Sequence, residues 1–490
     1  MIAMLFPMNR LRLLLIVLLF SFSCQVGQAN VGTPAAKLCA PIFNDHAVFQ
    51  QGEAIPVWGS APAGALISVE FNDATVTTRA APDGSWQLEL PPMPADKLDH
   101  LDQFPEGRTL TVTSDKGPAR KQIFHNILIG EVWLCSGQSN MAGKVRNNRK
   151  KQNPDDDLTQ LQMPALRQYR SDTGWISATP EEVREFSRVG VTFGRKLQQE
   201  LNVPVGLLFG AVGGTKIETW IRPDAGVDTS AKHAPGSNYR KHIDPIAGYG
   251  LKGILWYQGE GNASDGFAYF DKLKSLIDGW RTVWSNQALP FLIVQLAGIG
   301  QSDAEQPAMG DGRAAIREAQ FQAMKQFQNV GLATAIDIGG PGEHPPNKTD
   351  IGIRLAHWAL HHNYARETIA ASGPIFKGFE RKDSAMVIHF ENAEGLMLGR
   401  KDTYDPVQAV PEGTPLPWLS IQDQKGNWHW AESRILGETL VVQHPDVSNP
   451  KAVRYAWTNN PNHPVGPYLY NQYGLPAFPF TTESWSSLLD

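Results

Sequence analysis

The fold is decided by the stretch IGEVWLCSGQSNM, Ile129 to Met141. The apolar run from Ile127 to Cys135 is broken only by a Gly-Glu pair, which predicts a buried strand of a parallel sheet. Ser139 follows just beyond the end of this strand. In open α/β sheets, ligands bind outside the carboxyl ends of the strands. We therefore expect a parallel α/β fold with Ser139 at its functional edge. The alternative is an ordinary turn, since Gly, Ser and Asn are common turn residues.

The pattern after residue 127 alternates between strands and helices, which is typical of a parallel α/β domain. The predicted strands are Ile127–Cys135, Val203–Phe209, Lys252–Tyr257, Phe291–Leu296 and Val330–Ile338, and the predicted helices are Tyr269–Val283, Arg313–Phe327 and Asp350–Tyr364.

Polar clusters follow several of these strands. Ser139 is a possible nucleophile, Gly213 and Gly214 offer free backbone amides, and His344 is a possible base. A serine nucleophile needs a group that accepts its proton and N–H donors that bind the developing oxyanion. These three clusters could supply those parts, although order along the chain does not establish contact.

Short alternating runs punctuated by Gly, Pro, Asn and Asp lie on both sides of the α/β region, as in small β-sandwiches. We predict a signal peptide at 1–29, an N-terminal β domain at 30–126, an α/β catalytic domain at 127–371 and a C-terminal β domain at 372–490.

The N-terminus has the pattern of an export signal. Arg10 and Arg12 precede the apolar run Leu13 to Phe20, and Ala29 offers a cleavage site. The run is too short for a membrane span, and no other stretch approaches that length. We expect a periplasmic or extracellular protein. The segment before Cys24 matches a lipid-attachment site poorly.

Composition narrows the class of function. The 490 residues are 42% hydrophobic and carry a net charge of −5, which gives no electrostatic footprint for nucleic acid. Cleavage after Ala29 leaves Cys39 and Cys135, which we expect to be unpaired core residues. No Cys/His spacing indicates a metal site, and the oligomeric state is not indicated.

Several motifs together resemble the sialate O-acetylesterase family, a branch of the SGNH hydrolases. They are GEVWLCSGQSNM at 130–141, GGTKIETW at 213–220, WYQGEGN at 256–262, HPPNK at 344–348, VRYAW at 453–457 and GLPA at 474–477. The resemblance covers nearly the whole mature chain. It implies an SGNH-type α/β sheet domain flanked by β domains, and an esterase that removes acetyl groups from sugars without a metal or organic cofactor.

The resemblance also implies roles for individual residues. Ser139 would attack the acetyl carbonyl, and His344 would take its proton. The oxyanion would be held by the backbone amides of Ser139 and Gly214 and by a side-chain amide, for which Gln258 is the first choice and Asn262 the second.

The acid that would orient the histidine is less well marked. SGNH enzymes commonly place an aspartate three residues before the histidine, where this chain has Pro341. Related acetylesterases suggest Glu260 as the first choice, with Asp337 second and Glu343 a local competitor. A Ser–His dyad held by a backbone carbonyl is a further alternative.

The substrate class stays open within carbohydrate esters. Sialic acid esters fit the family, and acetylated plant cell-wall glycans fit an exported enzyme equally well. Two rivals are a non-catalytic carbohydrate-binding protein on the same scaffold and a serine peptidase. The peptidase reading lacks support because the segment has no Gly-x-Ser-x-Gly elbow.

Overall fold

The computed structural model describes residues 37–147, 157–224, 234–300, 312–461 and 466–489. The expected signal peptide and Cys24 lie outside these residues. No helix in the described part of the chain is both long and apolar enough to cross a membrane.

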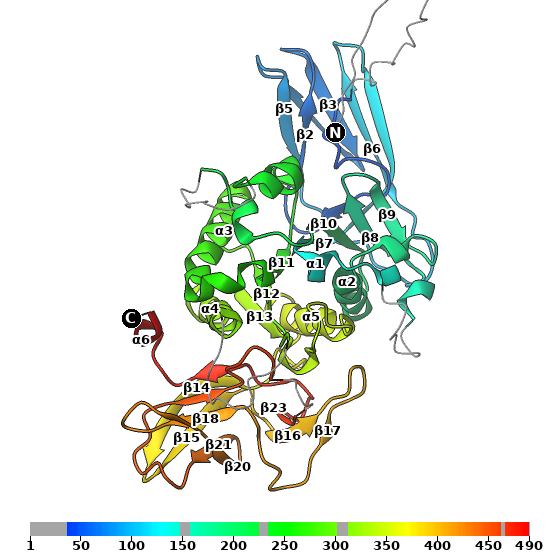
Figure 1. Ribbon diagram of the computed structural model, residues 1–490. Coiled ribbons are helices and arrows are strands. Elements are labelled where there is room, and N and C mark those ends of the chain that lie inside the picture. Colours follow the sequence, from blue (N-terminus) through cyan, green and yellow to red (C-terminus); the bar gives the residue numbers. More distant parts are fainter. Residues whose placement is uncertain (1–36, 148–156, 225–233, 301–311, 462–465, 490) are drawn as a thin grey trace, which may run out of the picture. The chain divides into compact units, whose positions relative to one another are not determined.

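The centre of the molecule is a mostly parallel sheet with strand order β13-β12-β11-β7-β10-β8-β9 (Figure 1). Its strands are β7 (Lys121–Gly137), β8 (Met163–Arg170), β9 (Gly174–Ala178), β10 (Val205–Ala211), β11 (Gly253–Tyr257), β12 (Phe291–Gln295) and β13 (Val330–Thr334). All neighbours are parallel except β8 and β9. The parallel α/β fold predicted from the sequence is confirmed.

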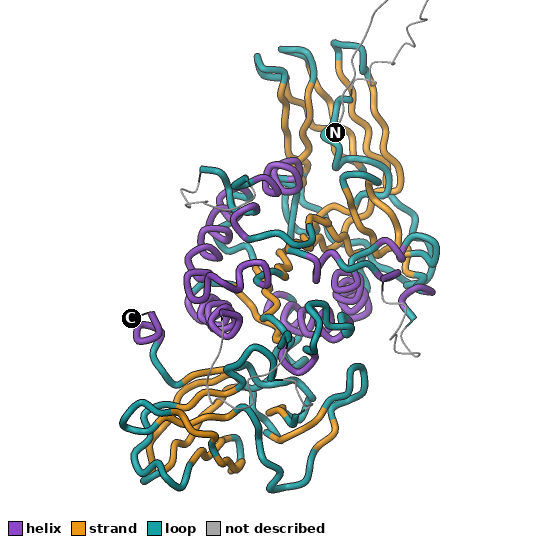
Figure 2. Tube along the Cα trace, in the orientation of Figure 1, coloured by secondary structure: helices purple, strands orange, loops and turns teal. Residues whose placement is uncertain are grey.

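Four long helices cover this sheet, as the purple coils of Figure 2 show. They are α2 (Arg188–Leu201), α3 (Tyr269–Val283), α4 (Gly312–Gln326) and α5 (Thr349–Asn363). Helix α2 contacts α5, and α3 contacts α4. Ring contacts join the two pairs to opposite faces of the sheet, Trp133 to Phe193 of α2 and Trp256 to Trp280 of α3.

The strand predicted over Val330–Ile338 is shorter than expected. Strand β13 ends at Thr334, and Ile336–Ile338 form a turn of 3-10 helix. Ile336 packs into the core of the C-terminal strands, and Asp337 turns inward to pair with Arg354. Extended backbone would send these two neighbouring side chains to opposite faces of the sheet.

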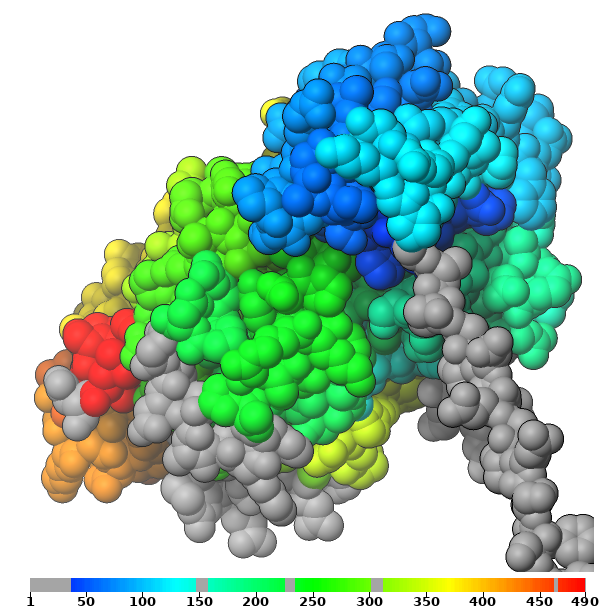
Figure 3. Space-filling model, turned by 90° about the horizontal axis from the view of Figure 1, so that it is seen from above, coloured from blue at the N-terminus to red at the C-terminus, as the bar shows by residue number. Residues whose placement is uncertain are grey.

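The N-terminal region is all β. Its strands are β1 (Val48–Gln50), β2 (Ile55–Ser60), β3 (Leu66–Phe71), β4 (Ala74–Arg79), β5 (Ser85–Leu90) and β6 (Arg108–Ser114). Strand β7 pairs with β6 through its first half and with β10 and β11 through its second half, so it crosses the boundary expected at residue 126. In Figure 3 these blue strands lie against the green centre of the chain, with which they share one apolar core.

The C-terminal region is also β-rich and has its own apolar core. It contains β14 (Ile375–Lys382), β15 (Ala385–Glu391), β16 (Met397–Arg400), β17 (Gln408–Ala409), β18 (Leu419–Gln422), β19 (Trp428–Trp430), β20 (Glu432–Leu436), β21 (Thr439–Gln443), β22 (Val453–Tyr455), β23 (Tyr468–Tyr470), β24 (Phe480–Thr481) and the short helix α6 (Trp485–Leu489). The β character expected for both ends of the chain is confirmed. The exact domain boundaries stay a prediction.

Both cysteines of the expected mature chain are buried and unpaired, as predicted. Burial raises the pKa of the Cys135 thiol to about 12, because the charged thiolate loses its hydration there. Cys135 therefore behaves as a small apolar residue against helix α2, where its sulfur lies close to Gly190.

A glycine at the end of β7 makes the turn toward Ser139 possible. Gly137 has φ of +134°, a conformation that residues with a side chain rarely adopt. A Cβ atom here would lie 2.1 Å from the carbonyl oxygen of Tyr257 on β11. The close approach of β7 and β11 at the site edge therefore requires glycine.

We expect Gly137→Ala to lower the free energy of unfolding by roughly 2–4 kcal/mol, since it combines backbone strain with a steric clash. Chemical denaturation of the purified protein measures this change. Gly143→Ala is the matched control, because its added Cβ would meet only ordinary contacts at 3.6 and 3.8 Å. Equal stabilities of the two variants would contradict the assignment.

Candidate active site

Ser139 and His344, which are 205 residues apart in the sequence, meet at the carboxyl edge of the sheet. Ser139 begins the short helix α1 (Ser139–Ala142), and His344 lies in the loop before α5. The distance from Ser139 Oγ to His344 Nε2 is 2.9 Å, a hydrogen bond. The serine is half-buried and the histidine is exposed. The pair thus has the geometry of a nucleophile beside its base, open to solvent.

The glycine loop after β10 lies beside the serine. A Cβ atom on Gly213 would lie 3.5 Å from Ser139 Cβ, and both Gly213 and Gly214 are exposed. Gly214 has φ of +70°. The first N–H groups of a helix have no acceptor within that helix, so the Ser139 N–H is available as well. Two clusters predicted from the sequence therefore adjoin one another.

Gln258 is fully buried and lies beneath residues 138–140, which carry Ser139 and are called the serine loop. Its Nε2 donates to Gln138 Oε1 at 3.2 Å, to the Thr215 carbonyl at 3.2 Å and to Asn262 Oδ1 at 2.7 Å. Its Oε1 accepts from the Tyr269 hydroxyl at 2.8 Å. These contacts tie together the three loops that follow β7, β10 and β11. The role of Gln258 as an oxyanion donor stays a prediction.

Asn262, the alternative donor, is buried in the same network. Its Nδ2 donates to Glu218 Oε2 at 3.0 Å and to Asp265 Oδ2 at 2.7 Å, and its Oδ1 accepts from the Ile217 N–H at 2.9 Å. In this arrangement Asn262 fixes the loop that carries the Gly-Gly motif.

Glu260 reaches the serine loop, although its partner is Asn140 rather than the histidine. Its Oε1 accepts a hydrogen bond from Asn140 Nδ2. Burial raises the pKa of Glu260, partly offset by the hydrogen bonds it accepts and by Lys348. Within the described residues no side-chain carboxylate forms a hydrogen bond with His344. The assignment of the triad acid therefore stays a prediction.

Asp337, the second choice for the acid, binds Arg354 and Tyr470. Its two oxygens accept from Arg354 at 2.7 and 2.8 Å, and one also accepts from the Tyr470 hydroxyl at 3.1 Å. Arg354 lies on α5 and Tyr470 on β23. This contact set joins helix α5 to the C-terminal strands and gives Asp337 a structural role.

Three polar residues near the site were not singled out from the sequence. Gln138 accepts from the Gly261 N–H at 3.1 Å, and Asn140 contacts both Glu260 and Lys348. Burial lowers the pKa of Lys348 to about 7. The sequence feature that could have identified them is their position. Gln138 and Asn140 flank Ser139, and Lys348 follows His344 by four residues.

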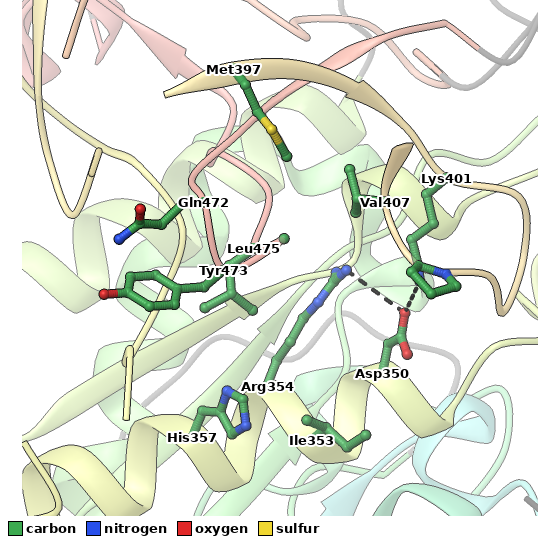
Figure 4. A pocket seen from close by; sticks show the side chains of 12 residues that line it. Asp350, Ile353, Arg354, His357, Met397, Lys401, Val407, Gln472, Tyr473 and Leu475 are labelled. Atoms are coloured by element: carbon green, nitrogen blue, oxygen red, sulfur yellow. Dashed lines mark ion pairs between the residues drawn. The ribbon is translucent and has the colours of Figure 1, made fainter. Parts of the chain in front are cut away.

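Among the described residues, two hollows of interest lie away from the serine. Figure 4 shows a pocket of about 380 Å³ between α5 and the C-terminal strands, where Asp350 pairs with Arg354 at 3.9 Å and with Lys401 at 2.9 Å. A groove of about 1140 Å³ lies between β2, β5 and the segment before β11, near the amino ends of the parallel strands. Neither Ser139 nor His344 lines these hollows. The described residues also contain no cluster of metal-ligating side chains.

Comparison with known proteins identifies the family likeness. Residues 129–361 match the family described as carbohydrate esterase, sialic acid-specific acetylesterase. The sialate O-acetylesterase of Homo sapiens is 25% identical over 509 residues, covering 91% of this chain and 92% of the relative. That of Rattus norvegicus is 25% identical over 512 residues, covering 87% and 90%.

A solved structure extends the likeness to the fold. A carbohydrate acetylesterase from Xanthomonas citri superposes with a TM-score of 0.79 at 29% identity, covering 91% of this chain and 99% of that one. The resemblance to the sialate O-acetylesterase family expected from the motifs is confirmed. The same comparisons place the chain among the carboxylic ester hydrolases.

We expect Asp337→Ala to lower the free energy of unfolding by about 3–5 kcal/mol, because the buried Arg354 guanidinium loses both of its hydrogen bonds to Asp337 and, of its carboxylate partners, keeps only the 3.9 Å pair with Asp350. The control is Asp278→Ala, which breaks the exposed pair with Lys274 and should cost about 0.5 kcal/mol or less. Urea denaturation of both variants makes the comparison. A small effect of Asp337→Ala would contradict the structural role.

Proposed function

We propose that this carboxylic ester hydrolase removes O-acetyl groups from carbohydrates through a Ser139–His344 acyl-enzyme mechanism. The observation that carries the proposal is the 2.9 Å contact between Ser139 Oγ and His344 Nε2 at the carboxyl edge of the sheet. The family likeness of residues 129–361 supports the acetyl ester as the bond that is cleaved.

The chemistry follows from the two side chains. Ser139 Oγ attacks the acetyl carbonyl carbon while His344 Nε2 takes the hydroxyl proton. The sugar oxygen then leaves with that proton, and an acetyl-serine remains. Water, deprotonated by the same imidazole, attacks the acetyl-serine and releases acetate. In the first half of the reaction His344 gives its proton to the leaving sugar oxygen. In the second half it gives the proton taken from water to Ser139 Oγ, so it acts as base and then as acid in each half.

The backbone amides of Ser139 and Gly214 are the proposed donors to the oxyanion. Their support is the place of Ser139 at the first residue of α1, where its N–H has no acceptor within the helix, and the exposed Gly-Gly loop beside the serine. Donors held by the fold need no reorganisation as charge develops, and loss of one costs about 100- to 1000-fold in kcat. Gln258 is the proposed side-chain donor, with Asn262 as the alternative. Each would have to release a present partner to reach the oxyanion.

The proposed substrates are acetylated sialic acids or acetylated plant cell-wall glycans. The similarity to mammalian sialate O-acetylesterases supports the first, and the solved Xanthomonas citri carbohydrate acetylesterase supports acetylated carbohydrates more broadly. An exposed His344 and exposed glycines leave room for a sugar that is part of a larger glycan. An exported location, periplasmic or extracellular, completes the proposal and rests on the N-terminal pattern at 1–29.

We expect the purified mature protein to release acetate from at least one member of a substrate panel, and Ser139→Ala to lower kcat by about 1000-fold or more. The panel contains a 9-O-acetylated sialoside, acetylated xylan, acetylated xyloglucan and an aryl acetate. Acetate is quantified enzymatically, and the best natural substrate identifies the glycan class.

The matched control is Ser177→Ala, on edge strand β9, which should keep wild-type activity. Full activity of Ser139→Ala would show that another residue is the nucleophile. A folded wild-type protein that binds these glycans and releases no acetate would favour the non-catalytic binding function.

A further inference from the structure

We propose that Asn140 is a positioning residue that holds the loop carrying His344 at the correct distance from Ser139. This inference rests on the proposed function and deepens it, since it concerns the same serine and histidine. It gives a role to the buried polar network behind the two residues, in which no carboxylate of the described residues forms a hydrogen bond with the imidazole.

Asn140 contacts the loop of His344 on both sides of the histidine. Its Nδ2 donates to the carbonyl oxygen of Glu343 at 3.1 Å, and its Oδ1 accepts from Lys348 Nζ at 2.5 Å. Residue 343 directly precedes the histidine, and residue 348 begins the approach to α5. One side chain therefore binds both ends of the segment that presents His344. Because Asn140 directly follows Ser139 in α1, it links that segment to the nucleophile through a single peptide unit.

Opposite charges fix the orientation of the Asn140 amide. The same Nδ2 also donates to the Glu260 carboxylate, while the Oδ1 faces the Lys348 amine. A flipped amide would place its carbonyl oxygen against the Glu260 carboxylate and its N–H groups against the N–H groups of Lys348. Charge-assisted hydrogen bonds are stronger than neutral ones. The buried charges thus hold the amide in the one orientation that also binds Glu343.

Burial makes this arrangement stiff. Asn140 is 1% exposed and Lys348 is 8% exposed. The Lys348 amine also lies 5.5 Å from the centre of the Tyr257 ring. Within the described residues Glu260 Oε2 has no hydrogen-bond partner, so Glu260 depends on Asn140 for its side-chain contact. Displacement of the loop would break the hydrogen bonds of Asn140 to Glu343 and Lys348 inside the protein.

The alternative is a purely structural network, whose loss would lower stability and leave the chemistry intact. The two roles differ in what they do to the folded enzyme. Substitution of a positioning residue changes the geometry between Ser139 Oγ and His344 Nε2. It therefore affects kcat and the reactivity of the serine more than KM. A misplacement of about 1 Å at a reacting centre costs about 100-fold in rate.

The test measures the reactivity of Ser139 in Asn140→Ala, Asn140→Asp and Lys348→Met. The probe is diethyl p-nitrophenyl phosphate. Ser139 Oγ forms a bond to phosphorus, the bond from phosphorus to the aryl oxygen breaks, and His344 takes the hydroxyl proton. Release of p-nitrophenolate gives the rate, and mass spectrometry confirms the site. Acetate release gives kcat and KM, and thermal unfolding confirms that each variant is folded at the assay temperature.

We expect Asn140→Ala to lower kcat and the labelling rate by about 100-fold with little change in KM. Asn140→Asp keeps the shape of the side chain, replaces the donor with an acceptor that repels Glu260, and should lose activity in the same direction. Lys348→Met removes one of the two loop contacts and should give a smaller loss. These last two variants carry the test if Asn140→Ala does not fold.

The matched control is Asn471→Ala in the C-terminal region. Asn471 is fully buried and makes four side-chain hydrogen bonds to backbone groups, none of them near the serine. It should lower the melting temperature and leave kcat unchanged.

An active wild type whose Asn140 and Lys348 variants keep kcat and labelling rate would overturn the positioning role alone. A wild type that neither releases acetate nor reacts with the phosphate ester would overturn the proposed function and the positioning role together.

Discussion

Strand β7 pairs in parallel with β10 on one side and with β11 on the other, and this pairing fixes where the loops that follow the three strands begin. Ala211 and Tyr257 are both in register with Gly137, so the three strands end side by side. The chain runs to β8 and β10 on one side of β7 and then returns to β11 on the other. Such a reversal leaves a crevice at the carboxyl ends of the strands. Ser139, the Gly-Gly loop and the Gln-Gly-Glu loop meet there because the strand register places the ends of β7, β10 and β11 side by side.

The buried polar network follows from that convergence. Three loops with polar side chains are brought into one small volume, where each unpaired polar group would cost stability. Gln258 and Asn262 satisfy the groups that join the loops, and Asn140 satisfies those beneath the histidine. These hydrogen bonds restrict the movement of the loops that they join. The site is therefore preorganised by the contacts that also stabilise the fold.

The loop that carries His344 is also bound by the C-terminal region, in addition to Asn140. The Tyr404 hydroxyl donates to the Pro346 carbonyl at 2.9 Å, and Asn347 Nδ2 donates to the Thr403 carbonyl at 2.5 Å. Thr403 and Tyr404 belong to the segment between β16 and β17. The loop that presents His344 thus lies between Asn140 on the sheet side and the C-terminal strands. This arrangement gives the C-terminal region a mechanical connection to the site.

Sequence alone determined the parallel fold and the helix over Tyr269–Val283, because apolar periodicity is a local property of the chain. The sequence suggested the pairing of Ser139 with His344 only through the family resemblance, and the tertiary structure brings the two side chains into contact. The sequence left the acid undecided and placed β13 four residues too long. Only the tertiary structure decided that Asp337 pairs with Arg354 and that Glu260 contacts Asn140. Hydrogen-bond partners of buried side chains are chosen by the three-dimensional packing of distant segments, and spacing along a chain does not encode which carboxylate faces which donor.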